Sequence, residues 1–138
     1  MMNPSSESTN VNPSIRPLRK VYAKRADRRK IALPTLEGIH FEKINELVSL
    51  EAQGNYSVLK FTNNRQLLVS KTLREIEQML NDNQRFIRIH RSFTINLDFI
   101  LKYIRGKGGY VIMEDGSNVS VSVSRKQALM DAVTLYFC

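Results

Sequence analysis

The chain is 138 residues long and 42% hydrophobic, and its 21 Lys and Arg against 13 Asp and Glu give a formal net charge of +8. This length suits one domain, and the ordinary apolar fraction excludes a chain that is disordered throughout. No apolar run approaches the roughly 18 residues of a membrane span, and Cys138 is the single cysteine, which excludes an internal disulfide and a thiolate zinc site, so we expect a cytoplasmic protein.

Residues 1–30 hold most of the net positive charge, with eight basic side chains against two acidic ones. Their first half is rich in Ser, Asn and Pro and has neither helical nor strand periodicity. We therefore expect a disordered basic tail, followed by a folded domain over 31–138. The tail is compatible with a solvated segment of no function or with electrostatic attraction to nucleic acid. An organelle transit peptide is disfavoured, because the start lacks an amphipathic period.

Short apolar alternations separated by turn residues begin at residue 31. Gly-Asn at 54–55 and Asn-Asn at 63–64 suit tight turns, because these residue types tolerate a positive φ. Strands this close together form antiparallel hairpins, since parallel crossovers need about a dozen residues or more. The strands expected in this half of the domain cover 31–33, 39–41, 47–52, 56–61 and 66–69.

Two helices are expected to interrupt the strands. The first begins at Thr72, where Thr72-x-x-Glu75 matches a capping box, and ends at 81–83; the second begins at Ser124, where Ser124-x-x-Gln127 matches another. The sequence thus predicts a mainly β fold of about ten short antiparallel strands and two short helices. The remaining strands are expected over 86–89, 93–95, 100–104, 110–113 and 119–123, with a hairpin turn at Asp115-Gly116.

Motifs of catalysis are missing from the sequence. It contains no nucleotide-binding loop, no nucleophile elbow and no pair of histidines at metal-ligand spacing. The glycine-rich stretch 105–110 leads into β-type residues rather than into the helix of a phosphate site, so we interpret it as a tight strand connection. We therefore expect no enzyme activity, no metal, no cofactor and no small-molecule substrate.

Three polar residues, His90-Arg91-Ser92, separate two alternating segments. An ordinary hairpin turn is one interpretation, but the turn lacks Gly, Asn, Asp and Pro, which indicates side chains held outward toward a ligand. The surrounding residues 84–110 contain six basic side chains against the single acidic residue Asp98, a bias that fits a phosphate-facing surface. The six are Arg85, Arg88, Arg91, Lys102, Arg105 and Lys107.

Six short motifs follow one another in a fixed order: LEAQGNY at 50–56, VSKTL at 69–73, FIRIHRSF at 86–93, INL at 95–97, GGY at 108–110 and VSRK at 123–126. Each motif alone is weak, but the ordered set resembles the LytTR DNA-binding domain. The resemblance extends over about residues 31–135, nearly all of the expected folded part.

This resemblance implies a bacterial transcription regulator with an elongated antiparallel β domain and no helix-turn-helix, whose loops enter successive major grooves of double-stranded DNA. Arg can bind guanine and Asn can bind adenine in a bidentate manner, whereas Ser70, Lys71 and the backbone amides near Ser124 suit phosphate contacts. The expected DNA contacts are Asn55, Tyr56, Ser70, Lys71, His90, Arg91, Ser92, Ser124, Arg125 and Lys126.

Most members of the family carry an upstream receiver domain, which 30 tail residues are too few to encode, so a phosphorylation switch is not expected. The resemblance allows a second copy on repeated DNA sites, and a membrane or sensor protein, as further partners. One alternative is a non-specific RNA- or single-strand-binding β module, although most Phe and Tyr lie in apolar strand phases rather than at stacking positions. Another alternative is a protein-binding adaptor that uses the tail.

Overall fold

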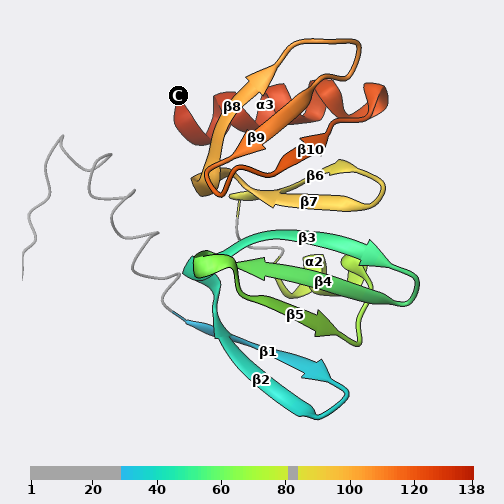
Figure 1. Cartoon of the computed structure of the whole chain (residues 1–138). Coiled ribbons are helices and arrows are strands. Elements are labelled where there is room, and N and C mark those ends of the chain that lie inside the picture. The colour runs from blue at the N-terminus through green and yellow to red at the C-terminus, as the bar shows by residue number, and fades with distance from the viewer. Residues whose placement is uncertain (1–28, 81–83) are drawn as a thin grey trace, which may run out of the picture.

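Three antiparallel sheets and two α-helices make up the described part of the computed structural model, residues 29–80 and 84–138 (Figure 1). The predicted mainly antiparallel β fold of about ten strands and two helices is confirmed, whereas the predicted tail falls outside these ranges except for Arg29 and Lys30. No helix in the described ranges is long and apolar enough to cross a bilayer. The elements are β1 Lys30–Thr35, β2 Gly38–Lys43, β3 Leu47–Gln53, β4 Tyr56–Phe61, β5 Gln66–Val69, α2 Leu73–Met79, β6 Phe86–His90, β7 Phe93–Asn96, β8 Ile100–Ile104, β9 Tyr110–Met113, β10 Asn118–Ser120 and α3 Lys126–Phe137.

The central sheet has five strands in the order β5-β4-β3-β7-β6, so the hairpins β3–β4 and β6–β7 lie side by side. Two-residue turns at 54–55 and 91–92 connect the strands of these hairpins. The hairpin β1–β2 stands at one end of the central sheet, and the small sheet β8-β9-β10 stands at the other, with α3 behind it in Figure 1. The domain is therefore elongated along this stack, as the family resemblance implied.

The tight turns form where the sequence predicts them. Asn63 and Asn64 have φ angles of 64° and 59°, which Asn tolerates better than most residues with a side chain. At the turn between β9 and β10, the backbone N–H of Ser117 donates to Asp115 Oδ1 (2.9 Å). This side-chain contact stabilises the turn of a hairpin in which only three residues of β10 pair with β9.

The last strand, β10, is shorter than predicted, because it ends at Ser120 instead of continuing to residue 123. Val121 N donates to Gly109 O (3.0 Å), and Ser122 N donates to Ile89 O (2.9 Å). The chain thus leaves the small sheet after β10 and forms a hydrogen bond with β6 of the central sheet. Alternation of apolar residues in the sequence cannot distinguish a partner in the small sheet from a partner in the central sheet.

Helix α2 begins as predicted, with a complete capping box. Thr72 Oγ1 accepts from Glu75 N (3.3 Å), and Thr72 N donates to Glu75 Oε1 (2.9 Å). The hydrogen bond from the Thr72 backbone lowers the pKa of Glu75, so the carboxylate is charged at neutral pH. Leu73, Ile76 and Leu80 are buried on one face, as predicted. The helix ends at Met79; the predicted end at 81–83 lies outside the described residues.

The prediction that Ser124 caps the last helix is wrong. Ser124 lies inside a 3₁₀ segment, Val123–Arg125, and α3 begins only at Lys126 without a side-chain cap. Arg125 N donates to Ser122 O (3.0 Å), so the chain already has helical hydrogen bonding on the N-terminal side of Ser124. The predicted apolar stripe of α3 is confirmed, since it packs against the core. Its members are Leu129, Ala132, Val133 and Tyr136.

The two candidate caps therefore predict different effects on stability. Thr72→Ala is expected to lower the free energy of unfolding by about 1 kcal/mol, because the amide of Glu75 loses its acceptor. Ser124→Ala is expected to leave the free energy of unfolding unchanged, because the hydroxyl caps nothing. Urea unfolding of both variants measures the difference, and an equal loss in the two would contradict the assignment of the caps.

Two hydrophobic cores lie along the stack, and β3 contributes to both. Leu47 and Leu50 of β3 pack into a core with α2. Val48, also from β3, packs into a second core with Leu129 of α3. A β-bulge between Leu47 and Ser49 changes the alternation of the strand at this point. The central strand therefore joins the two halves of the domain.

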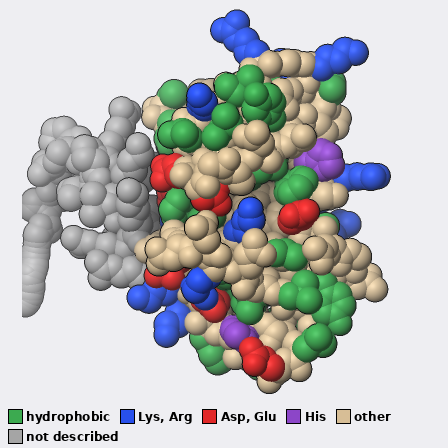
Figure 2. All heavy atoms as spheres, in the orientation of Figure 1, with side chains coloured by type: hydrophobic (Ala, Val, Ile, Leu, Met, Phe, Trp, Pro, Cys, Tyr) green, Lys and Arg blue, Asp and Glu red, His purple; other side chains and the backbone are tan. Residues whose placement is uncertain are grey.

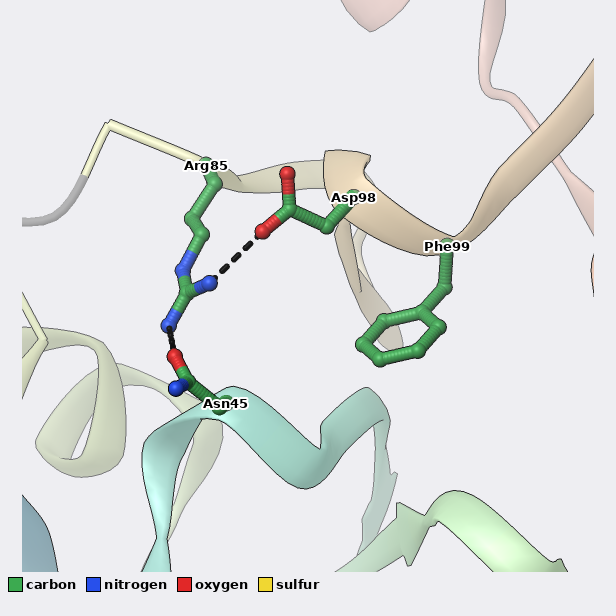
Figure 3. Close-up of a pocket in the computed structure, with 4 residues that line it drawn as sticks. All are labelled: Asn45, Arg85, Asp98 and Phe99. Carbon is green, nitrogen blue, oxygen red and sulfur yellow. Dashed lines mark hydrogen bonds and ion pairs between the residues drawn. The ribbon is translucent and has the colours of Figure 1, made fainter. Parts of the chain in front are cut away.

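A buried ion pair lies where the two halves meet (Figure 3). Arg85 is 3% exposed, and its Nη1 donates to Asp98 Oδ2 (2.6 Å) while its Nη2 donates to Asn45 Oδ1 (3.0 Å). Tyr136 Oη of α3 donates to the other oxygen of Asp98 (2.5 Å). These bonds connect the start of β3, the start of β6 and the end of α3 around one pocket, which Phe99 also lines.

Candidate nucleic-acid interface

One edge of the central sheet brings the two polar hairpin turns together. Strands β3 and β7 are antiparallel, and Glu51 near the end of β3 pairs with Phe93 at the start of β7. The turns 54–55 and 91–92 therefore lie at the same edge. A hydrogen bond from Ala52 N to the carbonyl oxygen of the second turn (2.8 Å) joins them directly.

Two further predicted segments reach the same edge. Strand β5 ends beside the start of β4, which brings residues 70–71 next to the first turn. The bond from Ser122 N to Ile89 O (2.9 Å) brings the start of α3 next to the end of β6. We call the segments 54–56, 70–71, 90–92 and 122–126 the loop edge, which lies on the right in Figure 1.

All ten side chains predicted to contact DNA lie on the loop edge, and none is buried. The structure thus assembles residues that lie up to 71 positions apart in the sequence, from Asn55 to Lys126. The exposed members are Asn55, Ser70, Arg91 and Ser124, and the half-buried members are Tyr56, Lys71, His90, Ser92, Arg125 and Lys126.

The turn between β6 and β7 is held by side chains of its neighbours. His90 Nδ1 accepts from Ser92 N (3.1 Å), and Arg88 Nη1 donates to Arg91 O (2.9 Å). These bonds explain why the turn needs no Gly, Asn, Asp or Pro, a point that the sequence alone leaves open. Because Nδ1 accepts this hydrogen bond, the ring N–H lies at Nε2 and is available as a donor. Within the described residues the exposed guanidinium of Arg91 makes no hydrogen bond.

Beneath this turn lies a charged cluster that sequence reasoning missed. Arg88 binds Glu77 of α2 in a bidentate manner, through Nε (2.8 Å) and Nη2 (2.9 Å). Thr94 Oγ1 of β7 donates to the same carboxylate (2.6 Å). The cluster therefore connects α2 to both strands of the β6–β7 hairpin. The cluster is visible only in the structure, because its residues come from separate elements. In the sequence, Glu77 resembles any solvent-exposed charge on a short helix.

The basic surface is smaller than the sequence suggests. Of the six cations in residues 84–110, Arg85 is buried against Asp98 and Arg88 is bound to Glu77. Their assignment to a phosphate-facing surface is therefore wrong, because both guanidinium groups stabilise the fold instead. The four that remain exposed are Arg91, Lys102, Arg105 and Lys107.

The two edges of the domain nevertheless differ in charge. Around the loop edge, the connections carry six cations, and their one acidic residue in the described part, Glu37, accepts from His40 (2.8 Å). Figure 2 shows Lys and Arg side chains projecting from the upper and right-hand margins of the molecule. The six are Lys71, Arg91, Arg105, Lys107, Arg125 and Lys126, whereas the connections at the opposite edge contain Glu46, Asp98, Glu114 and Asp115 together with Arg65 and Arg85, which are paired with Glu42 and Asp98.

The chemistry of the loop edge suits a nucleic-acid duplex. Arg91 and Arg125 offer the fork of donors that fits the guanine edge, and Asn55 offers the donor and acceptor that fit adenine. The cations among these residues also suit phosphate oxygens, and contacts to phosphates fix register without sequence preference. Groups of three or more His, Cys, Asp or Glu that could hold a metal ion are absent from residues 29–80 and 84–138.

Three comparisons place the chain among known proteins. Residues 37–134 match the family described as the LytTr DNA-binding domain. A relative from Rhodospirillum rubrum, the CO-responsive transcriptional regulator RcoM, is 31% identical over 123 residues, which are 88% of this chain and 49% of the relative. The chain thus spans about half the length of this curated relative.

The fold also matches a solved structure. A LytTr DNA-binding domain from Bacillus cereus superposes with a TM-score of 0.66 and 23% sequence identity, covering 76% of this chain and 96% of that one. At this identity the likeness concerns the fold. It agrees with the arrangement of sheets and helices described above.

Proposed function

Because the chain belongs to the LytTR DNA-binding domain family, a family of DNA binding and transcription regulation, we propose that it recognises a specific sequence of double-stranded DNA through the loop edge. The observation that carries this proposal is the exposed Arg91 on a turn fixed by Arg88 and His90. Because these bonds hold the backbone of the turn, Arg91 starts from a fixed position, and less backbone conformational entropy is lost when its donor fork binds a base.

The loops, and not a recognition helix, contact the DNA in this proposal. Strands lie about 4.8 Å apart, so the five-stranded sheet is about 19 Å wide, or about 6 base pairs at 3.4 Å each. A duplex along the loop edge meets the segments 54–56, 90–92 and 124–126 in that order. Segments 54–56 and 90–92 therefore lie within about half of one 34 Å helical turn, and a successive major groove is reached only beyond the sheet, where 124–126 leads into α3. Ser70 and Lys71 contact phosphates.

The decisive experiment is selection of bound fragments from genomic DNA, followed by footprinting and by titration of the selected duplex against random duplex. We expect one recurring site and a strong preference for it. Single-stranded DNA and RNA serve as competitors. Equal binding to all of these nucleic acids would favour a non-specific module and would contradict the proposal.

Partners other than DNA are part of the same proposal. A second copy bound at a repeated site would double the protected length, and a membrane or sensor protein would supply the regulatory signal in the cytoplasm. Light scattering with one-site and two-site duplexes measures the stoichiometry. A single bound chain on a two-site duplex would exclude the second copy.

The basic tail is expected to contribute general affinity. Deleting residues 1–29 removes seven basic and two acidic side chains. Binding to random duplex should weaken and its salt dependence should flatten, because a protein with fewer cations on the phosphates displaces fewer counterions from the DNA. The preference for the selected site should persist. Loss of that preference would show that the tail contacts bases, and an unchanged salt dependence would show that the tail makes no contact.

The cluster beneath the β6–β7 turn is expected to set specificity. Arg88→Lys keeps the positive charge but cannot make the bidentate contact with Glu77 together with the bond to Arg91 O. We expect the preference for the selected site to fall about tenfold, the equivalent of about 1.4 kcal/mol, while the salt dependence stays the same. A parallel loss of affinity for random duplex would mean that Arg88 acts through charge alone.

A further inference from the structure

A glycine-rich loop extends the loop edge beyond the segments that the family resemblance assigns to DNA. This loop, residues 105–109, joins β8 to β9 and carries Arg105 and Lys107, both exposed. We propose that Arg105 and Lys107 contact DNA phosphates and lengthen the interface at this end of the domain. The proposal rests on the proposed function, since it assumes a duplex along the loop edge.

The loop is held in one conformation. Tyr103 Oη donates to Gly108 O (2.6 Å). A Cβ on Gly108 would lie 1.9 Å from Val121 O, and a Cβ on Gly109, whose φ is +79°, would lie 2.3 Å from Tyr103 Oη. The two glycines therefore let the loop backbone pack directly on the segment before α3. A loop ordered in this way loses little conformational entropy when its side chains bind a phosphate.

The same contacts tie the loop to the residues predicted to contact bases. Val121 N donates to Gly109 O (3.0 Å), and the next residue, Ser122, donates to Ile89 O (2.9 Å) at the end of β6. Lys126 Nζ of α3 donates to Gly106 O (3.4 Å). The loop, the start of α3 and the β6–β7 turn thus form one connected surface, and a duplex that meets the last two passes the loop.

The charges at the two ends of the loop edge show in which direction the interface extends. At the other end, the β1–β2 turn carries Leu36, which is 81% exposed, and the carboxylate of Glu37. An exposed apolar side chain next to a carboxylate is unfavourable beside phosphates, whereas two cations are favourable. The interface therefore extends toward the β8–β9 loop and not toward the β1–β2 turn.

We assign phosphates rather than bases to these two side chains because of their setting. Residues 106, 108 and 109 of the loop are glycines, so the loop itself supplies no further polar side chain to orient the two cations against a base edge. Contacts of this type raise affinity for every sequence equally and fix the register of the duplex. Each contact should add about 0.9 to the slope of log affinity against log salt.

The test compares full-length variants in salt titrations with random duplex and with the selected site. Lys107→Ala should lower the slope by about 0.9, and the double variant Arg105→Ala/Lys107→Ala by about 1.8. Lys43→Ala is the matched control, because it removes one exposed lysine at the opposite edge and should leave the slope unchanged. Footprints of the double variant should shorten on one flank only. The preference for the selected site should stay the same in every variant.

An unchanged slope and footprint in the double variant would overturn the proposal, as would a slope that falls equally in Lys43→Ala. A double variant that loses its preference for the selected site would place the loop against bases and would overturn the assignment to phosphates. Failure of the proposed function is a separate result, because the unmodified chain would then show no preference for any duplex. Thermal unfolding of the variants shows whether each remains folded, and their exposed side chains predict unchanged melting temperatures.

Discussion

Replacing Asp98 by Ala is expected to lower the free energy of unfolding by about 3 kcal/mol. The carboxylate faces the guanidinium of Arg85, which is 3% exposed, and also accepts from Tyr136 (2.5 Å). Its removal leaves a buried positive charge without the compensating negative charge, and the desolvation of that charge is then opposed by less attraction. The Asp98 side chain is 22% exposed, which places the expected loss at the lower end of the range for buried pairs.

Two variants separate the charge of Asp98 from its hydrogen bonds. Asp98→Asn keeps the shape but not the charge and should lose nearly as much stability as Asp98→Ala. Tyr136→Phe removes one hydrogen bond and should cost about 1 kcal/mol. Urea unfolding measures all three. If Asp98→Ala lost no more stability than Tyr136→Phe, the ion pair would be irrelevant to the fold.

Arg91→Ala is expected to weaken binding to the selected site by about 1–3 kcal/mol and to relax the choice at one base position. The guanidinium is exposed at the centre of the loop edge, on a turn whose carbonyl and amide groups are held by Arg88 and His90. Nothing in the fold depends on it, so the melting temperature should not change. Titrations with duplexes that vary one base pair at a time identify the affected position.

Lys71→Ala is the matched comparison for Arg91→Ala. Lys71 also lies on the loop edge, but we assign it to a phosphate. Its removal should weaken binding to all duplexes equally and lower the salt slope by about 1. If Arg91→Ala showed the same uniform loss, or retained full affinity and preference, the turn would not contact a base.

The strands of this fold were predictable because short hairpins are determined by residues that are close together in the sequence. Alternation of apolar residues and turn types such as Gly-Asn at 54–55 locate the strands to within a few residues, and the capping box at Thr72 locates α2. The same kind of signal failed at Ser124. A Ser-x-x-Gln pattern carries no information about Ser122. The amide of Ser122 donates to β6, and its carbonyl oxygen accepts from Arg125 N, which starts the 3₁₀ segment before Ser124 could act as a cap.

The predicted DNA contacts share one edge because β3 lies between β4 and β7. The alternation of the sequence does not specify that order, and the family resemblance supplied the residues that the order brings together. The roles of Arg85 and Arg88 could not be predicted either. Each cation is neutralised by a carboxylate from another element, Asp98 and Glu77, and a count of charges along the sequence treats such pairs as surface.

The position of β3 in both hydrophobic cores has a consequence for the order in which the domain folds. Ser49 pairs with Ile95, a partner far along the chain, whereas β4 pairs with β3 through a two-residue turn. Loop closure costs more entropy for the distant pairing than for the local one, so we expect the two halves to form first and to join late. The two turns of the loop edge become neighbours only in that last step. A half-folded chain therefore presents no complete surface to a duplex, and DNA stabilises the joined state alone by mass action.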